Sequence, residues 1–340
     1  MTDVMLDPTK RGYWTSDQEV RWCPGCGDYG ILAAMQFLYA DLPDVKKENT
    51  VFVSGIGCAA RFPYYMSTYG MHSIHGRAPA IATGLAVARP DLDVWVVGGD
   101  GDMLSIGGNH LIHALRRNVN LKILLFNNQI YGLTKGQYSP TSEVGKVTKS
   151  TPMGSIDIPF NPLSLAAGAG ASFIARTHDL DRKHMMESFK RAHEHKGAAL
   201  VEIYQNCNVF NDGAFDAINK RDARAEMMID LEHGKPIIFG AEDQRGIVID
   251  NGVARIVEIA DVGTDALLVH DEKQQNPSVT FALAQLANDR VSPTPFGIFR
   301  SVENQEYAEA VSAQLVAAND QKGPGDLGAL LRSGATWEVE

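Results

Sequence analysis

The sequence GGDGDMLSIGGNHLIHALRRNVNLKILLFNNQIYG, residues 98–132, holds two polar turns that each follow an apolar run. The run 93–97 before the first turn is typical of a short buried strand, and so is the run 121–126 before the second. Between them, apolar residues near helical spacing predict a helix over 105–118. This order of elements predicts an α/β fold built on a doubly wound, mostly parallel sheet.

Two polar side chains, Asp100 and Asn128, follow these strands. Because the carboxyl ends of parallel strands meet at the edge where open α/β folds bind ligands, we expect the two to converge. Their oxygens and the Ile130 carbonyl suit Mg²⁺, which completes its shell with water and phosphate oxygens. The glycines around Asp100 permit a sharp turn and leave N–H groups for the same phosphates. The pattern resembles the diphosphate-binding motif of thiamine diphosphate enzymes, whereas the competing interpretation is two ordinary turns.

The composition is that of a globular protein with a large core. Of 340 residues, 44% are hydrophobic and 21% are charged. The net charge of −10, without a basic run, argues against a nucleic-acid-binding surface. No apolar run approaches the roughly 18 residues of a membrane span, and the first residues lack the apolar core of a signal peptide. We therefore expect a cytoplasmic protein.

The motif WCPGCGD, residues 22–28, places Cys23 and Cys26 on one tight loop. Three interpretations compete for it: a redox dithiol, a zinc site and a pair of iron–sulfur ligands. A redox dithiol needs no further cysteine, and a zinc site usually shows a second close pair of Cys or His, which is not visible here.

The other two cysteines, Cys58 and Cys207, also follow apolar runs that predict strands, 51–54 and 200–204. We therefore expect all four cysteines at the edge of the sheet that carries Asp100. Four cysteines at dispersed positions fit a 4Fe–4S cluster. The competing interpretation is that each cysteine is a small buried apolar side chain.

Two further segments are candidates for contacts with substrate. His75 precedes the apolar segment 78–88, which predicts a buried helix whose start attracts anions. The loop 132–160 is long, and long loops in compact domains are usually lids or partner-facing segments. Thr134 and Lys135 lie in it just past the proposed Mg²⁺ ligands. Lys135 is a cation suited to an anionic substrate tail, and the competing interpretation is a solvent-exposed lysine.

The rest of the chain continues the alternation of helices and strands, with a weaker signal after residue 214. The patterns predict a helix over 161–169, a strand over 171–176, a helix over 179–195, two strands within 253–270 and helices over 277–288 and 303–319. We predict an N-terminal arm over 1–20, a cofactor domain over 21–215 and a C-terminal extension over 216–340. The extension is expected to pack on the core or on a partner.

Together, these motifs resemble the β subunits of the 2-oxoacid:ferredoxin oxidoreductases, most of all the two-subunit 2-oxoglutarate type. The resemblance covers roughly residues 15–215. It is carried by WCPGCG (22–27), GIGC (55–58), IHGR (74–77), GGDGD (98–102), NN (127–128), IYGLT (130–134), GQ (136–137) and Cys207.

The resemblance implies thiamine diphosphate, Mg²⁺ and a 4Fe–4S cluster. The implied cluster ligands are Cys23, Cys26, Cys58 and Cys207, and the implied Mg²⁺ ligands are Asp100, Asn128 and the Ile130 carbonyl. Cofactor contacts are predicted at Gly57, His75, Gly99, Asp100, Gly101, Asp102, Asn128, Gly132, Leu133 and Thr134, and catalytic roles at His75, Thr134 and Lys135. Family members often carry a small residue where this chain has Lys135, which leaves the substrate preference open.

The implied activity is the coenzyme A-dependent oxidative decarboxylation of 2-oxoglutarate to succinyl-CoA and CO₂, with electrons passed through the cluster to ferredoxin. Thiamine enzymes normally need a glutamate from a second domain, so we expect an α subunit as partner, in a dimer of αβ pairs. One alternative is pyruvate or a broad range of 2-oxoacids as substrate. Others are a non-oxidative thiamine-dependent decarboxylase or synthase with a structural Cys₄ zinc site, and a non-catalytic electron-relay subunit.

Overall fold

The computed structural model describes residues 7–286 and 292–339. Their central element is an eight-stranded sheet, which confirms the predicted doubly wound, mostly parallel architecture. Neighbouring strands run parallel except at β11, which is antiparallel to β5. In spatial order the strands are β2 (Tyr69–His72), β1 (Thr50–Ser54), β3 (Asp93–Gly99), β4 (Lys122–Asn127), β6 (Ala199–Tyr204), β5 (Phe173–His178), β11 (Thr294–Ser301) and β7 (Met228–Leu231).

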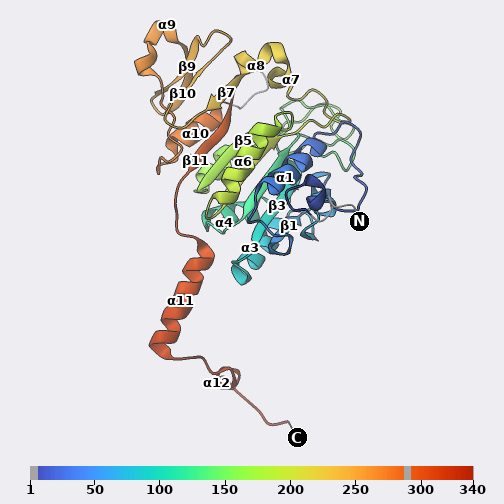
Figure 1. Cartoon of the computed structure of the whole chain (residues 1–340), viewed down its shortest axis with the longest axis vertical. Helices are drawn as coiled ribbons and strands as arrows, with labels where there is room; N and C mark the ends of the chain where they lie inside the picture. Colours follow the sequence, from blue (N-terminus) through green and yellow to red (C-terminus); the bar gives the residue numbers. More distant parts are fainter. Residues whose placement is uncertain (1–6, 287–291, 340) are drawn as a thin grey trace.

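Helices cover both faces of this sheet (Figure 1). On one face α1 (Asp28–Asp41) packs against α6 (Arg182–Glu194). The other face is covered by a layer of four helices, which are α3 (Ala78–Ala88), α4 (Gly108–Arg116), α5 (Pro162–Gly168) and α10 (Ser278–Gln285).

Alternate residues of β3 show why two layers form. Val94 and Val96 join the buried cluster that contains α3 and α4, whereas Trp95 and Val97 join the cluster that contains α1 and α6. Successive side chains of a strand point to opposite faces, so a strand that is apolar at every position must be covered on both.

The helix predicted over 105–118 begins later than expected, at Gly108. Residues Asp102–Ile106 instead form a π-helical turn, in which Ser105 has φ −91° and ψ −107°. Gly107 makes this bend possible, because a Cβ there would lie 2.5 Å from the Asp102 carbonyl oxygen. The spacing of apolar residues, from which the helix was predicted, carries no information about this close contact between two backbone segments.

A small antiparallel sheet lies in sequence between β7 and β11, two strands of the main sheet. It contains β8 (Ile238–Phe239), β9 (Arg245–Asp250) and β10 (Val253–Glu258). The prediction of two strands within 253–270 is wrong, since only β10 lies there and the partner strand β9 precedes it. The pair Asn251-Gly252, with φ 50° and 82°, forms the hairpin turn between them.

The remaining elements are short, apart from one long C-terminal helix. They are α2 (Phe62–Tyr65), α7 (Asp216–Asn219), α8 (Arg221–Met227), α9 (Ile259–Val262), α11 (Tyr307–Lys322) and α12 (Leu327–Leu331), with 3₁₀ turns at Arg11–Trp14, Lys47–Asn49, Ala59–Arg61 and Thr264–Ala266. The helix predicted over 277–288 corresponds to α10, and its residues 287 and 288 lie outside the described ranges. The helix predicted over 303–319 corresponds to α11.

The two ends of the chain differ in how they contact the rest. Trp14, in the predicted N-terminal arm, is fully buried, with its ring 5.0 Å from that of Tyr39. In contrast, α11 and α12 extend away from the body of the subunit (Figure 1). The side chains of α11 are exposed from residue 312 onward. In the ranges 7–286 and 292–339, no helix is long and apolar enough to cross a membrane.

Candidate cofactor site

The polar residues predicted to converge lie at one edge of the sheet. Because β1, β3, β4 and β6 are parallel neighbours, the segments that follow them leave from the same edge. Gly99 pairs with Phe126, which places Asp100 beside the turn that begins at Asn127. Register thus brings together two sites separated by a whole helix in the sequence.

Asp100 is buried, with 2% of its surface exposed. Its Oδ2 accepts hydrogen bonds from the hydroxyls of Ser139 and Thr141, both at 2.5 Å. Burial raises the pKa of the carboxyl to about 6, against the opposing effect of these hydrogen bonds. A cation beside Asp100 would favour the ionised form, so the carboxylate is a suitable ligand for Mg²⁺.

The Asn128 side chain is held at both ends. Its Nδ2 donates to Gln205 Oε1 at 2.8 Å, and its Oδ1 accepts from the Ile130 N–H at 3.2 Å. Gln129 between them has φ 56°, a left-handed conformation that turns the chain sharply. The turn is closed by Asn211, whose Nδ2 donates to the Asn128 carbonyl at 2.8 Å.

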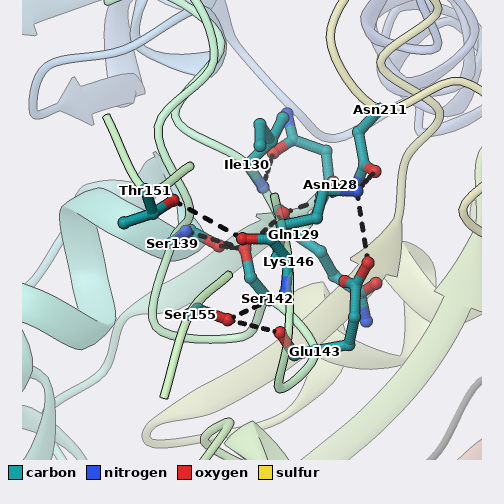
Figure 2. A network of polar contacts seen from close by, with 10 residues as sticks. All are labelled: Asn128, Gln129, Ile130, Ser139, Ser142, Glu143, Lys146, Thr151, Ser155 and Asn211. Carbon is teal, nitrogen blue, oxygen red and sulfur yellow. Dashed lines mark hydrogen bonds and ion pairs between the residues drawn. The ribbon is translucent and has the colours of Figure 1, made fainter. Parts of the chain in front are cut away.

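Figure 2 shows how the loop after this turn is fixed to it. Ser142 Oγ donates to the Gln129 carbonyl at 2.7 Å, and Lys146 Nζ donates to Asn211 Oδ1 at 2.5 Å. Lys146 also forms an ion pair with Glu143 at 3.3 Å. The long loop 132–160, predicted as a lid or a partner-facing segment, is therefore hydrogen-bonded to the turn that carries the proposed Mg²⁺ ligands.

A buried polar chain runs from Asp100 into the sheet. Thr141 Oγ1 lies 2.9 Å from Asn127 Oδ1, and Asn127 Nδ2 donates to Glu202 Oε1 at 2.7 Å. Glu202 forms a fully buried ion pair with Arg176, at 2.7 Å. A cavity of about 460 Å³ lies beside this chain, and these four residues contribute to its lining.

His75 and Asp102 form a second part of the site. The His75 Nδ1 lies 2.5 Å from Asp102 Oδ1, which also accepts from the N–H groups of Gly76 and Ile56 at 2.7 and 3.1 Å. Asp102 Oδ2 is buried and has no hydrogen-bond partner among the described residues. Gly55 leaves room for it, since a Cβ there would lie 1.9 Å from that oxygen.

The predicted glycine contacts lie in tight surroundings. A Cβ on Gly101 would lie 2.1 Å from the ring of Tyr131, whose hydroxyl donates to the Gly101 carbonyl at 3.0 Å. Gly99 is more open, with its nearest neighbour the Phe126 carbonyl at 3.9 Å from a Cβ position. Gly57 has φ 147° and open space where a Cβ would lie.

The residues after the Asn128 turn are exposed rather than packed against Asp100. Leu133, Thr134 and Lys135 all reach solvent. The Thr134 hydroxyl donates to Gln137 Oε1 at 2.5 Å, within the same turn. Lys135 has φ 76°, which is unusual for a residue with a side chain.

The four cysteines gather at the same edge, and all are free thiols. A Cβ on Gly132 would lie 3.6 Å from the sulfurs of both Cys58 and Cys207. Negative charge on Cys58 or Cys207 would raise the pKa of Cys26, and negative charge on Cys23 would raise the pKa of Cys58, so these thiols are near neighbours. Burial, reinforced by Asp28 and Cys207, raises the pKa of the Cys58 thiol to about 12.

The raised pKa values of these thiols are compatible with cysteines that ligate a cationic centre. Burial is also the main cause that raises the pKa of Cys26 and Cys207. A bound metal centre would stabilise thiolates that the protein alone leaves unfavourable. Within the described ranges, no three His, Cys, Asp or Glu side chains are grouped tightly enough to hold a single metal ion, so the cysteines share one edge without forming a compact single-ion site.

Two buried carboxyls, those of Asp28 and Asp179, lie near the cysteines. Burial and then the neighbouring Asp179 raise the pKa of Asp28 to about 7, and burial raises the pKa of Asp179 to about 6. Asp28 Oδ2 and Asp179 Oδ1 have no hydrogen-bond partner among the described residues. A Cβ on Gly27 would lie 1.8 Å from Asp179 Oδ2, so this glycine of the WCPGCG motif makes room for the carboxyl.

The sequence-based prediction missed several residues of the site. Ser139, Thr141 and Gln205 contact the proposed Mg²⁺ ligands, and Asp28 and Asp179 lie behind the cysteines. Gln205 directly follows a strand that ends at the same edge, which is a usable signal. The hydroxyls of the long loop give no such signal, because their place depends on how the loop folds back.

Comparison with known proteins assigns this site to a family. Residues 55–203 match the thiamine pyrophosphate enzyme C-terminal TPP-binding domain. The chain is 56% identical over 335 residues to 2-oxoglutarate oxidoreductase subunit KorB of Mycobacterium tuberculosis, covering 98% of this chain and 89% of the relative. It is 47% identical to the β subunit of 2-oxoacid:ferredoxin oxidoreductase 1 of Aeropyrum pernix, over 56% of this chain and 60% of that protein.

A solved structure shows the same likeness in three dimensions. It is the 2-oxoglutarate:ferredoxin oxidoreductase from Magnetococcus marinus with 2-oxoglutarate, coenzyme A and succinyl-CoA bound. The TM-score is 0.73 at 32% sequence identity, and the match covers 96% of each chain. The resemblance seen in the sequence motifs is confirmed, and the chain belongs to the β subunits of the 2-oxoacid:ferredoxin oxidoreductase family.

Proposed function

We propose that this chain is the β subunit of a 2-oxoglutarate:ferredoxin oxidoreductase. In this proposal it holds thiamine diphosphate, Mg²⁺ and a 4Fe–4S cluster at the carboxyl edge of its sheet. One observation carries the proposal: a single side chain, Gln205, contacts both Asn128 and Cys26, with Nδ2–Oε1 and Nε2–Sγ distances of 2.8 and 3.4 Å. The proposed magnesium site and the cysteine group are therefore parts of one site.

The donor sets suit these groups. Asp100, Asn128 and the Ile130 carbonyl offer hard oxygen atoms to Mg²⁺. The four thiols, with Gly132 between two of them, offer soft ligands for iron. The Asp102 Oδ2 is buried and has no partner among the described residues. We propose that it accepts a hydrogen bond from thiamine diphosphate. We propose Gly57, Gly99 and Gly101 as backbone contacts to the cofactor.

Thiamine diphosphate, when bound, supplies the electron sink for decarboxylation, and a bound cluster supplies one-electron acceptance. The chain's own residues hold these groups and orient the side chains around them. Asp102 accepts from His75 Nδ1–H, which leaves Nε2 as the ring nitrogen that holds or releases a proton toward substrate. The loop hydroxyls of Ser139 and Thr141 keep the Asp100 carboxylate in place.

Substrate preference is assigned to the exposed turn after Asn128. We propose that Lys135 meets the distal carboxylate of 2-oxoglutarate, with Leu133, Thr134 and Gly132 forming the wall around it. The place of Lys135 in the turn that follows the proposed Mg²⁺ ligands supports this role, whereas its exposed side chain is equally what a solvent-facing lysine would show. Pyruvate, which lacks the second carboxylate, would gain nothing from that charge.

An α subunit is the proposed partner, since similar proteins are named as β subunits of 2-oxoacid:ferredoxin oxidoreductases. In this proposal the α subunit supplies the glutamate that activates the thiamine ring and most of the coenzyme A site, in a dimer of αβ pairs. Ferredoxin is the proposed electron acceptor. The predicted cytoplasmic location and the three-part division of the chain stay predictions.

The decisive experiment is anaerobic co-purification of this chain with its α chain. We expect about four irons and four sulfides per β chain, together with thiamine diphosphate and Mg²⁺. The complex should reduce ferredoxin when given 2-oxoglutarate and coenzyme A, and the β chain alone should not. Zinc without sulfide, in a complex that decarboxylates without reducing ferredoxin, would instead identify the non-oxidative alternative.

A further inference from the structure

Gln205 lies at the point where the two halves of the site meet. It follows β6 directly, and its N–H donates to the Asn127 carbonyl at 3.0 Å, which continues the pairing with β4. Its side chain is fully buried. Gly27 makes room for it, since a Cβ there would lie 3.1 Å from Gln205 Cγ.

The backbone carbonyl of Asn206 decides which way the Gln205 amide faces. This carbonyl lies 2.6 Å from one end of the amide. A carbonyl oxygen only accepts hydrogen bonds, so the end that it meets must be Nε2. The other end, which meets Asn128, is therefore Oε1.

The same carbonyl thereby fixes the amide of Asn128. Since Gln205 presents an acceptor, Asn128 must present its Nδ2 as the donor, at 2.8 Å. The Asn128 Oδ1 then faces the other way, toward the Ile130 N–H and the proposed Mg²⁺ position. A flipped Asn128 would offer a positively polarised NH₂ group, which does not ligate a cation.

The remaining N–H of Gln205 points at a cysteine. Its Nε2 lies 3.4 Å from Cys26 Sγ, a normal distance for a hydrogen bond to sulfur. Hydrogen bonds to ligand sulfurs stabilise the added negative charge of a reduced cluster, and they are one determinant of reduction potentials. One buried amide therefore serves both parts of the site.

We propose that Gln205 is a positioning residue that orients Asn128 for Mg²⁺ and raises the reduction potential of the cluster by its hydrogen bond to Cys26. The inference rests on the proposed function, because it takes Asn128 and Cys26 as ligands. It goes beyond that function because Gln205 is not itself a ligand. The residue is assigned a role toward the Mg²⁺ ion and toward the cluster.

Two substitutions separate the two roles in the αβ complex. Gln205→Met keeps the length of the side chain and removes both hydrogen bonds. We expect Mg²⁺-dependent binding of thiamine diphosphate to weaken by about 10-fold or more, and the midpoint potential of the cluster to become more negative. In Gln205→Glu, a protonated carboxyl donates its single O–H to the Asn206 carbonyl and keeps its other oxygen as the acceptor for Asn128, so only the donor to Cys26 is lost. We expect its thiamine diphosphate affinity to stay near that of the wild type while its potential becomes more negative.

The matched control is Asn208→Ala. The Asn208 Nδ2 donates to the Pro24 carbonyl on the same cysteine loop, at 2.7 Å, and among the described residues this side chain has no hydrogen bond to a sulfur. It should change neither quantity. Affinity is measured by calorimetry with Mg²⁺ and thiamine diphosphate, and the potential by redox titration followed by electron paramagnetic resonance.

A Met variant in which either quantity equals that of the wild type overturns the double role. So does a Glu variant that loses thiamine diphosphate affinity as the Met variant does. A wild-type complex that contains no iron and sulfide, or that binds no thiamine diphosphate, refutes the proposed function itself. The two failures are therefore distinguishable.

Discussion

The Thr141 hydroxyl lies 2.5 Å from Asp100 Oδ2, across a separation of 41 positions in the sequence. Ser139 reaches the same oxygen at the same distance. The middle of the long loop is therefore hydrogen-bonded to the proposed magnesium ligand. We therefore expect the order of the loop and the orientation of the carboxylate to depend on each other, which can be tested.

Replacing Thr141 by Val removes one of the two hydroxyls and preserves the volume of the side chain. We expect the affinity for Mg²⁺ and thiamine diphosphate to fall by about 10-fold, because Asp100 loses part of its support. Trypsin should also cleave faster after Lys146 and Lys149, because the loop opens more often. Both effects are measured on the purified complex, by calorimetry and by timed digestion.

Thr177→Val is the control for that prediction. Thr177 is also a buried threonine, but its hydroxyl pairs with His184 at 2.8 Å, away from the loop. It should affect neither the affinity nor the digestion. A Thr141→Val protein with wild-type affinity and wild-type resistance to trypsin would show that the loop and the carboxylate are independent.

Serine in place of Cys58 or Cys207 should abolish the cluster. Serine is a poor ligand for iron in these centres, so the broad absorbance near about 400 nm and the acid-labile sulfide should be lost. Binding of thiamine diphosphate should persist, because the hydrogen bonds to Asp100 and Asn128 do not involve these two residues. A variant that keeps its sulfide would remove that cysteine from the ligand set.

Lys135→Met tests substrate selection. The variant keeps the stem of the side chain and removes its charge, so we expect kcat/KM for 2-oxoglutarate to fall by about 10-fold or more relative to that for pyruvate. Lys149→Met, an exposed lysine farther along the same loop, is the control. An unchanged ratio of the two substrates in the Lys135 variant would show that this lysine does not recognise the distal carboxylate.

Asp179→Asn should change how stability depends on pH. Burial raises the pKa of Asp179 from 3.8 to about 6 in the folded protein, so folding favours the protonated form. The resulting stabilisation is complete below pH 3.8 and is lost as the pH rises through about 6. At pH 8 the wild type has lost on the order of 2–3 kcal/mol from this group, whereas the Asn variant does not titrate.

The measurement is the melting temperature of both proteins between pH 5 and pH 8. The Asn variant should gain on the wild type as the pH rises, since the buried wild-type carboxyl ionises through about pH 6 while the amide stays neutral. A gap between the two melting temperatures that is the same at every pH would contradict a raised pKa.

The sequence predicted the sheet and the convergence of its strand ends well, for a physical reason. A fully buried strand must be apolar at every position, so polar residues such as Asp100 and Asn128 mark its end clearly. Parallel pairing then carries such ends to one edge. Cys58 and Cys207 could be placed by the same argument, because they also follow buried strands.

What could not be predicted depends on partners distant in the sequence. Ser139 and Thr141 are ordinary loop residues until the loop folds back on Asp100. Gln205 gains its proposed role only when the carbonyl of its neighbour Asn206 is combined with two groups distant in the sequence, the amide of Asn128 and the sulfur of Cys26. The sequence does not show which neighbour the oxygen of an amide side chain faces and which neighbour its nitrogen faces.

The C-terminal strand escaped prediction because its composition is poor for a strand. β11 contains Pro295 and Gly297, and Gly297 has φ 112°. Proline and glycine weaken a strand assigned from sequence alone. Its place is determined instead by the neighbours on both sides, β5 and β7, which supply the pairing.

The position of β11 in the sheet has a consequence for biosynthesis. It lies between β5 and β7, yet it emerges from the ribosome after about 290 residues have been made. Until then the nascent chain exposes the edge of β5, and such edges recruit strands from other chains. Premature termination before residue 294 should therefore yield an aggregating fragment rather than a shortened enzyme, even though every cysteine and every proposed magnesium ligand has already been translated.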